Sequence, residues 1–368
     1  MGLHGQPCAH HAAFAVPRDG ARRREPPARR RARHRRAPDR RDHALRTRRA
    51  PLDRTARRRP GGLSPARPTL PAPRRAPRTR PDPEESSVPE STSWRPGDAL
   101  LADKVAVVAG GGRGIGEATT RILAAAGAAV GVVDVEAERA EAVAASLRAE
   151  GATALPVVAD LFDEAACAAA IGAVTAEFGR VDVLANVAGG MTGLAEWRHL
   201  EHWSTEQWDR VLHLNLRYVF WLCRAVLPGM VERGGGSIVS VTSISGVHGA
   251  PNHSAYGAAK AGLIHLTKTL AVEYGRFGVR VNAVSPGAIA TPATDAVLSA
   301  ERKATLAAAT PLQRPGRPDD IARAVLYFAS PMSEYVTGQM LLVDGGVGSK
   351  FPLGGTGTHV SEAALPTG

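Results

Sequence analysis

The sequence predicts an α/β fold, in which one doubly wound domain is built on a seven-stranded parallel sheet. Seven short apolar runs are rich in β-branched residues, Ala-rich helical stretches separate them, and this alternation continues over about 245 residues. Strands that alternate with helices favour a parallel sheet that is covered on both faces. A domain of this length buries a substantial core.

The expected strands lie at residues 105–109, 129–133, 154–159, 181–185, 237–241, 279–284 and 339–343. A helix is expected after the first strand, and it should end near Gly127. The folded domain is predicted to cover residues 99–348. Residues 349–368 are rich in Gly, Thr and Ser, so they are predicted to form a flexible tail.

The first 100 residues have a different composition, with 25 arginines, no lysine, ten acidic residues and 16 of the chain's 27 prolines. We predict a disordered Arg/Pro-rich extension over residues 1–98, because so few large apolar side chains cannot offset the entropy of ordering. Three interpretations are open: an arm that contacts nucleic acid, an organelle-targeting peptide, or a start site placed too far upstream. Arginine without lysine is typical of translated GC-rich DNA, so we favour a start site placed too far upstream or an extension without function.

The positive charge of the chain comes from this extension, since residues 101–368 carry 21 basic and 25 acidic side chains. A mildly acidic domain disfavours nucleic acid as a partner. No apolar run reaches the roughly 18 to 20 residues that span a bilayer, so no membrane insertion is expected.

The cysteines are too few and too scattered for a disulfide framework or a metal knuckle: Cys8, Cys167 and Cys223. No metal is expected either, because the histidines show no ligand spacing: His248, His253 and His265. The first twenty residues hold no continuous apolar stretch, which argues against a secretory signal. We therefore expect a reducing, cytoplasmic location.

A glycine-rich stretch, Gly-Gly-Gly-Arg-Gly-Ile-Gly, joins the first expected strand to the helix that follows. Glycines let the backbone turn sharply, so that a pyrophosphate can approach the amide groups at the helix N-terminus. An ordinary tight turn is the plainer interpretation. The strand before and the helix after supply the context of a Rossmann-like dinucleotide site, which we predict here.

Asp134 ends the second expected strand, 24 residues beyond Gly110. A carboxylate there accepts hydrogen bonds from the ribose hydroxyls and repels a 2′-phosphate, so Asp134 favours NAD. Arg113 has the opposite effect, because a cation beside the glycines can receive a 2′-phosphate, and NADP therefore stays open. A helix cap is the plainer role for Asp134.

The glycine spacing resembles that of the short-chain dehydrogenase/reductase family, in particular its 3-oxoacyl carrier protein reductases. Further matches follow in the family's order: Asp160, Asn186-Val187-Ala188-Gly189, Asn215, Ser243, Tyr256 with Lys260, Ser285-Pro286-Gly287 and Thr291. The resemblance covers about residues 101–347. It implies a homodimer or homotetramer and an oxidoreductase that transfers hydride between a nicotinamide coenzyme and a secondary alcohol or ketone.

The resemblance also implies which residues contact the coenzyme: Gly110, Arg113, Gly114, Ile115, Gly116, Asp134, Asp160, Asn186, Ala188, Gly189, Tyr256, Lys260, Pro286, Gly287, Ile289 and Thr291. Asp160 would lie near the adenine and residues 186–189 along the ribose, while Ile289 and Thr291 would reach the nicotinamide amide. The plainer interpretation of Asp160 is the N-cap of a helix before Glu164.

Tyr256 and Lys260 are four residues apart in a predicted amphipathic helix, so they share one face. A free phenol has a pKa of about 10, and a neighbouring ammonium lowers it. Tyr256 can then take the alcohol proton as hydride leaves carbon, or return it when a ketone is reduced. Taken alone, the pair is more typical of the surface of an ordinary helix.

Ser243 follows the fifth expected strand, which places its hydroxyl at the carboxyl edge of the sheet. Thirteen residues separate it from Tyr256, as the resemblance requires, and its implied role is to stabilise charge on the substrate oxygen. By resemblance, Asn215 completes the catalytic set by holding a water that links Lys260 to solvent. Packing against a backbone carbonyl is the alternative for Asn215.

Three loops are expected to select the substrate, at residues 190–202, 244–252 and 290–310. They lack clustered arginines, so we expect a fairly apolar secondary alcohol or ketone. The tryptophans are expected in the core or an interface: Trp203, Trp208 and Trp221. The alternatives are an NADPH-dependent 3-oxoacyl reductase, a catalytically silent NAD-binding redox sensor, and an enzyme that associates with nucleic acid through the extension.

Overall fold

The computed structural model describes residues 100–191, 193–295 and 299–349. In this part of the chain, seven strands form one parallel sheet in the order β3-β2-β1-β4-β5-β6-β7. The chain starts at the centre of the sheet, winds outward to β3, and then crosses to β4 and winds outward to β7. This doubly wound order confirms the predicted fold class. The predicted extension, and the predicted tail beyond Ser349, lie outside the described residues.

Every apolar run predicted as a strand forms one. The strands are β1 Val105–Ala109, β2 Ala129–Asp134, β3 Ala154–Val158, β4 Val183–Asn186, β5 Gly236–Val241, β6 Val279–Pro286 and β7 Met340–Val343. The bounds move by up to two residues. β4 starts two residues later than predicted. The residue before it, Asp182, accepts a hydrogen bond from the backbone N–H of Val105 at its carboxylate, at 2.9 Å.

The α-helices are α1 Gly114–Ala125, α2 Ala137–Ala149, α3 Glu164–Phe178, α4 Thr205–Leu212, α5 Tyr218–Glu232, α6 Ser254–Tyr274, α7 Pro292–Asp295, α8 Ala300–Ala309 and α9 Pro318–Ala329. A π-helical turn, η3 His213–Arg217, joins α4 directly to α5. Single 3₁₀ turns are η2 Leu200–His202, η4 Ile244–Gly246, η5 Gly275–Phe277, η6 Pro331–Ser333 and η7 Val347–Ser349.

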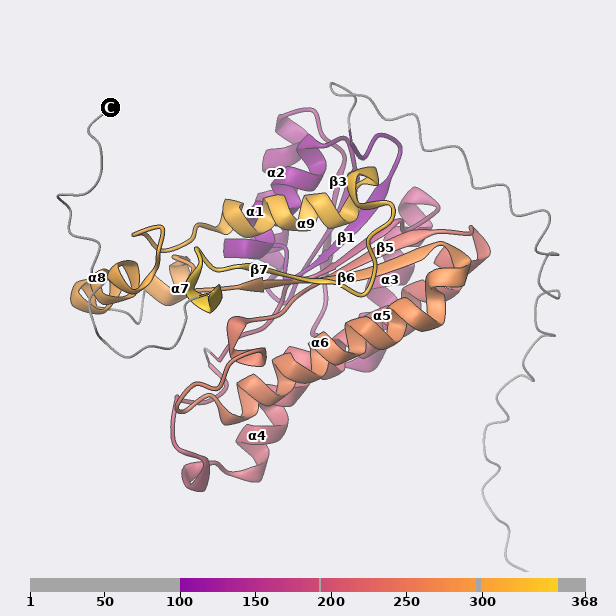
Figure 1. Ribbon diagram of the computed structural model, residues 1–368. Helices are drawn as coiled ribbons and strands as arrows, with labels where there is room; N and C mark the ends of the chain where they lie inside the picture. The colour runs from indigo at the N-terminus through magenta and orange to yellow at the C-terminus, as the bar shows by residue number, and fades with distance from the viewer. Residues whose placement is uncertain (1–99, 192, 296–298, 350–368) are drawn as a thin grey trace, which may run out of the picture. The chain divides into compact units, whose positions relative to one another are not determined.

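Strand side chains alternate between two apolar layers. Val107 packs with side chains of α3, α5 and α6, whereas its neighbours Ala106 and Val108 pack with α1, α2 and α9. Figure 1 shows α1 and α9 on one side of the sheet and α5 and α6 on the other. All five residues of β1 are buried, so this strand is apolar throughout, as in a sheet that is covered on both faces.

The N-cap of α3 is Asp163, whose carboxylate accepts the N–H of Ala165 at 2.7 Å. The plainer interpretation of Asp160 is therefore wrong, because the cap lies three residues further along the chain. The exposed carboxylate of Asp160 accepts the N–H of Phe162 at 2.9 Å instead, which stabilises the turn that follows β3.

The carboxyl edge of the sheet collects the segments that carry the predicted site. Since the strands are parallel, the loops after β1, β4, β5 and β6 all leave from this edge, and ligands of such sheets bind there. Within the described residues, no helix combines the length and the apolar character needed to cross a membrane.

Candidate active site

The loop after β1 is packed closely against its neighbours. Gly110 donates its N–H to Val133 O at 2.8 Å and has a φ of +82°. A Cβ at Gly110 would lie 2.8 Å from the Cα of Ala188, and one at Gly116 would lie 1.7 Å from the carbonyl oxygen of Gly110. Only glycine fits at both positions. The loop therefore brings bare backbone to the start of α1.

The first turn of α1 lies directly beyond this loop. The helix begins at Gly114, and Arg113 is its N-cap in an extended conformation with an exposed side chain. The first amide groups of a helix have no acceptor within it, so they are available to an anion. Ile115 turns toward the protein and packs against the layer of α1, α2 and α9.

Asp134 lies at the carboxyl end of β2, where its carboxylate is 6% exposed. It accepts the N–H of Gly112 at 3.2 Å and that of Glu136 at 3.1 Å, so it is fixed against the glycine loop. Arg139, from the first turn of α2, lies 3.6 Å from the carboxylate and also pairs with Glu136. The sequence reasoning considered Arg113 and missed Arg139, although its place shortly after the strand was a usable signal.

The segment after β4 forms the opposite wall. Val187 and Ala188 donate to the carbonyl oxygen of Ala109 at 3.0 and 2.8 Å, which holds this segment against β1. The Tyr218 hydroxyl donates to Ala188 O at 2.8 Å. Asn186 is fully buried and donates from its side chain to Ser240 at 3.2 Å. Its side chain therefore points into the sheet, and any contact of Asn186 with a ribose would come from its backbone.

Asn215 lies in the π-helical turn and fixes the chain after Ala188. Its side-chain oxygen accepts the N–H of Gly190 at 2.8 Å, and its amide donates to Gly190 O and Val211 O, each at 2.9 Å. A Cβ at Gly189 would lie 2.7 Å from this side-chain oxygen and 3.0 Å from Nζ of Lys260. Asn215, Gly189 and Lys260 are thus neighbours, as the resemblance implied.

Ser243, Tyr256 and Lys260 meet beside this segment. Ser243 follows β5 and accepts the N–H of Ser245 at 3.1 Å. Tyr256 and Lys260 lie one turn apart on α6, with Nζ of Lys260 at 5.7 Å from the centre of the Tyr256 ring. The same Nζ donates to the carbonyl oxygen of Val241 at 3.0 Å. The structure therefore brings all four predicted catalytic side chains to one place.

The electrostatics of this group differ from the expectation. Burial raises the pKa of Tyr256, and its hydrogen bond with Ser243 opposes that rise. Burial lowers the pKa of Lys260 from 10.5 to about 7, because the side chain is 2% exposed and its ammonium is removed from water. Desolvation therefore outweighs the expected lowering of the phenol pKa. Lys260 titrates near neutral pH, where a proton gained by its amine would favour the phenolate of Tyr256.

The loop after β6 lies across from the start of α1. β6 ends at Pro286, and Gly287 donates to Val343 O at 3.1 Å. Ile289 is buried and pairs with Gly316 in an isolated bridge. A Cβ at Gly114 would meet the side chain of Thr291 at 3.7 Å. The loops after β1 and β6 therefore face each other across the site.

These residues fit an extended dinucleotide. Bare glycine backbone and the free amides of α1 suit a pyrophosphate, and the fixed carboxylate of Asp134 suits a ribose. Asp160 lies in the loop that follows β3, at the same carboxyl edge of the sheet. In the described ranges, no group of three His, Cys, Asp or Glu side chains is arranged to hold a metal ion.

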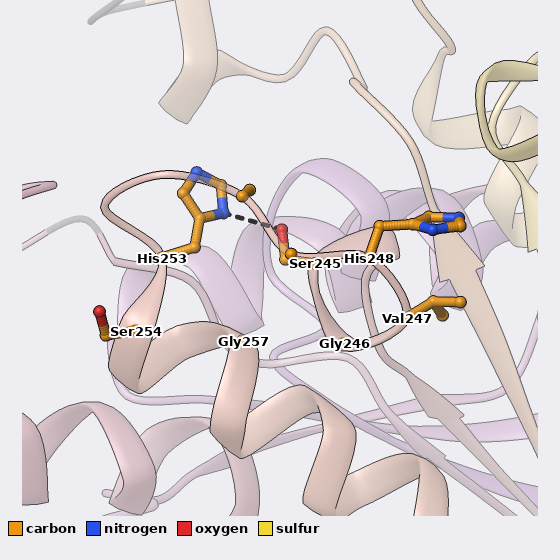
Figure 2. Close-up of a pocket in the computed structure, with 9 residues that line it drawn as sticks. Ser245, Gly246, Val247, His248, His253, Ser254 and Gly257 are labelled. Atoms are coloured by element: carbon orange, nitrogen blue, oxygen red, sulfur yellow. Dashed lines mark hydrogen bonds between the residues drawn. The ribbon is translucent and has the colours of Figure 1, made fainter. Parts of the chain in front are cut away.

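Sequence reasoning missed two further neighbours of Tyr256. The Trp197 ring lies edge-on to the Tyr256 ring at 5.6 Å, and the His253 ring lies 6.2 Å from it. Figure 2 shows His253 and His248 on either side of Ser245, in the wall of a cavity of about 310 Å³. Trp197 and His253 lie in or beside the loops that are predicted to select the substrate, but no local sequence pattern shows that they approach Tyr256.

Known proteins are similar to this chain in sequence and in fold. Residues 109–348 match the family model described as Enoyl-(Acyl carrier protein) reductase. The chain is 44% identical over 246 residues to a cis-4-hydroxycyclohexanecarboxylate dehydrogenase of Sinomonas cyclohexanicum, which covers 67% of this chain and 97% of the relative. The chain belongs to the short-chain dehydrogenase/reductase family.

Other members of the family are similar at a comparable level. A 3-oxoacyl-(acyl-carrier-protein) reductase of Thermotoga maritima is 37% identical, over 67% of this chain and 98% of its own. A solved 7α-hydroxysteroid dehydrogenase, complexed with NADH and 7-oxo glycochenodeoxycholic acid, superposes with a TM-score of 0.66 at 33% identity, over 69% of this chain and 97% of that chain. A gluconate 5-dehydrogenase from Burkholderia cenocepacia, in complex with NADP and tartrate, gives 0.65 at 33% identity, over 69% and 98%.

These comparisons confirm the family, the fold class and the enzyme class that the sequence predicts. This short-chain dehydrogenase/reductase is an oxidoreductase that acts on CH–OH groups with a nicotinamide coenzyme.

Proposed function

We propose that this enzyme is an NAD-preferring dehydrogenase of fairly apolar secondary alcohols, with Tyr256 as the general acid/base. One observation carries the proposal: the side chains of Asn215, Ser243, Tyr256 and Lys260 gather at the carboxyl edge of the sheet, beside the glycine loop.

The coenzyme, when bound, supplies the acceptor or donor of hydride. The glycine loop and the amides of α1 would hold its pyrophosphate, Asp134 and Asp160 its adenosine, Ala188 and Lys260 its nicotinamide ribose, and Ile289 with Thr291 its nicotinamide amide. Asp134 supports a preference for NAD, because a buried carboxylate that Gly112 holds in place cannot turn away from a 2′-phosphate.

The side chains of the protein handle the proton. Ser243 donates a hydrogen bond to the substrate oxygen and stabilises the charge that develops there. Tyr256 takes the hydroxyl proton at its phenolic oxygen during oxidation and returns it during reduction. Lys260 stabilises the phenolate when its amine is protonated, and its pKa of about 7 allows both protonation states near neutrality. Asn215 fixes Gly190 and so keeps the backbone beside Lys260 in place.

An apolar substrate fits the surroundings of Tyr256. The phenol packs with a small cluster formed by Met191, Val211 and Ala255, together with partly buried neighbours such as Trp203 and Trp208. Relatives at 38 to 44% identity are named for a hydroxycyclohexanecarboxylate, a hydroxysteroid, levodione and threitol. Identity alone does not choose among such substrates, so the proposal stops at the class.

Replacing the phenol tests the proposal most directly. Tyr256→Phe removes the proton carrier, so we expect kcat for alcohol oxidation to fall by about 10² to 10⁴-fold. NADH binding, measured by fluorescence titration, should change less than about twofold, because the packing of the ring is retained. Tyr335→Phe is the matched control, since Tyr335 is fully exposed. Turnover that survives in Tyr256→Phe would contradict the assigned role.

A panel of alcohols and ketones, assayed with both coenzymes, identifies the substrate. Preferential reduction of 3-oxoacyl thioesters with NADPH would favour the biosynthetic reductase over the proposed dehydrogenase. Coenzyme binding without turnover on any member of the panel would favour a redox sensor.

We also propose a cytoplasmic homodimer or homotetramer, as the resemblance to the family implies, and light scattering tests the assembly.

A further inference from the structure

Two aromatic side chains next to Tyr256 take no part in the proton transfer described above. Trp197 lies between β4 and α4, and His253 is the N-cap of α6. Their rings stack, with centroids 4.1 Å apart and planes inclined by 27°. Both rings make edge contacts with the Tyr256 ring. The angle between the ring planes is 87° for Trp197 and 76° for His253. The three rings therefore form one wall of the site.

His253 is anchored to the loop that carries Ser243. Its Nδ1 lies 2.8 Å from the hydroxyl oxygen of Ser245, and Figure 2 shows this hydrogen bond. Ser245 in turn donates its N–H to the hydroxyl oxygen of Ser243. A continuous series of contacts thus runs from Ser243 through Ser245 and His253 to the Trp197 ring. Any shift of His253 would change where the indole lies relative to Tyr256.

Trp197 keeps a large free surface in spite of these contacts. It is 47% exposed, although its ring contacts Tyr256, which packs against the buried apolar cluster of Met191, Val211 and Ala255. Apolar area left in water costs about 25 cal/mol per Å², so a ligand that covers the indole gains free energy. An exposed indole face at 5.6 Å from the ring of Tyr256 is placed to cover the body of a substrate whose oxygen meets Tyr256.

His253 adds no positive charge to this wall near neutral pH. Burial lowers the pKa of His253 below its usual value, which favours the neutral imidazole. The cavity next to His253 is lined by serines, glycines, histidines, a valine and an alanine. This lining contains no lysine or arginine to pair with a phosphate.

We propose that Trp197 is a specificity-determining residue, held in place by His253 and Ser245, and that it selects ring-shaped secondary alcohols and ketones over open-chain ones. This inference rests on the proposed function and narrows its substrate class. A ring covers the flat indole in a single rigid contact. An open chain of equal size must lose rotational freedom before it covers the same area, so it gains less from the indole.

The test compares two six-carbon ketones, cyclohexanone and 2-hexanone, on the full-length enzyme. Their binding is measured by calorimetry in the presence of NAD, so that neither ketone is reduced. We expect Trp197→Ala to weaken cyclohexanone about tenfold, which corresponds to about 1.4 kcal/mol. Its effect on 2-hexanone should stay within about twofold, since that chain gains little from the indole. Equal losses for the two ketones would overturn the proposal.

Steady-state rates with cyclohexanol and 2-hexanol give an independent reading. If the indole binds the body of the substrate and not the reacting atoms, Trp197→Ala should raise KM for cyclohexanol and leave kcat within about twofold. A variant that merely loosened the fold would lower kcat for both alcohols together, and that result would also overturn the proposal.

The role of His253 as a positioning residue needs its own variants. His253→Ala removes the stack and should cost about threefold in cyclohexanone affinity, in line with the value of an aromatic pair. His253→Gln should restore most of that loss, because a planar amide can stack on the indole and still bond to Ser245. His265→Ala, on the exposed face of α6 and outside the lining of this cavity, is the matched control. Unchanged selectivity in His253→Ala would remove His253 from the proposal.

The two proposals fail in different ways. If Tyr256→Phe retains turnover, the proton-transfer scheme is wrong, while ketone binding still reports on the wall. If Trp197→Ala affects both ketones alike, the wall is wrong and the role of Tyr256 stands. If wild-type enzyme binds neither ketone, the apolar substrate class is wrong and both proposals fall.

Discussion

The active site has two halves, one formed mainly by backbone atoms and the other by side chains. The coenzyme half is mainly backbone, where Gly110 and Gly116 leave no room for a Cβ. The catalytic half is made of side chains such as Asn215 and Lys260, both of which are almost completely removed from water. One half is determined by steric contact, and the other by the free energy of burying polar groups.

This difference teaches where each half is vulnerable. A methyl group is enough to damage the coenzyme half, and its effect should not depend on pH. The catalytic half tolerates changes of shape better, but its stability and activity should change with proton concentration, because Lys260 titrates near neutrality. The experiments below separate these two behaviours.

The largest effect is expected from Gly116→Ala. The new Cβ would lie 1.7 Å from the carbonyl oxygen of Gly110, so the loop must move away from α1. A cost of about 3 kcal/mol would weaken NADH binding about 100-fold at every pH. Titration of NADH fluorescence measures this loss. Gly172→Ala is the control, because Gly172 lies within α3 and a Cβ there meets no atom within 4 Å. Unchanged affinity in Gly116→Ala would break the steric half of the comparison.

Lys260→Met should produce an effect on stability that depends on pH. The pKa of Lys260 is about 7 in the folded protein against an ordinary 10.5, so the unfolded chain binds the extra proton between these values. The contribution of Lys260 to the free energy of unfolding therefore rises with pH, by about 2 kcal/mol from pH 7 to pH 9. Urea unfolding at both pH values measures the difference between wild type and variant.

The exposed Lys268→Met variant is the control for this series. A constant difference between wild type and Lys260→Met across that range would show that Lys260 keeps an ordinary pKa, and the electrostatic half of the comparison would fail.

The smallest effect is expected from Asp134→Asn. The amide keeps an oxygen for the N–H of Gly112 but removes the negative charge and frees Arg139 from its ion pair. NADPH should then bind about tenfold more tightly, while NADH changes little. Competition between the two coenzymes measures this ratio, with the exposed Asp319→Asn as control. An unchanged ratio would show that the carboxylate does not select the coenzyme.

The sequence was sufficient to predict the fold, and it also predicted which four side chains gather beside the glycine loop, because both leave local patterns. A strand such as β1, buried along its whole length, is an unbroken apolar run, and the tight loop after it needs glycines at fixed spacing. Tyr256 and Lys260 lie one helical turn apart, so their shared face follows from the helix period alone.

What could not be predicted depends on contacts between distant segments. Trp197 reaches His253 from a loop more than fifty residues earlier. The side chain of Asn186 points to Ser240 because β4 and β5 pair in that register. The pKa values of Tyr256 and Lys260 also required burial, which spacing does not reveal.

The π-helical turn that carries Asn215 has a consequence for how this enzyme can vary. Such a turn holds one residue more than regular α-helix, which offsets α4 from α5 by about 100° around the common axis. Adding or deleting a single residue between Leu212 and Tyr218 would rotate Asn215 away from Gly190. The length of this stretch is therefore as much a requirement of the active site as the identity of its side chains, and natural indels should avoid it.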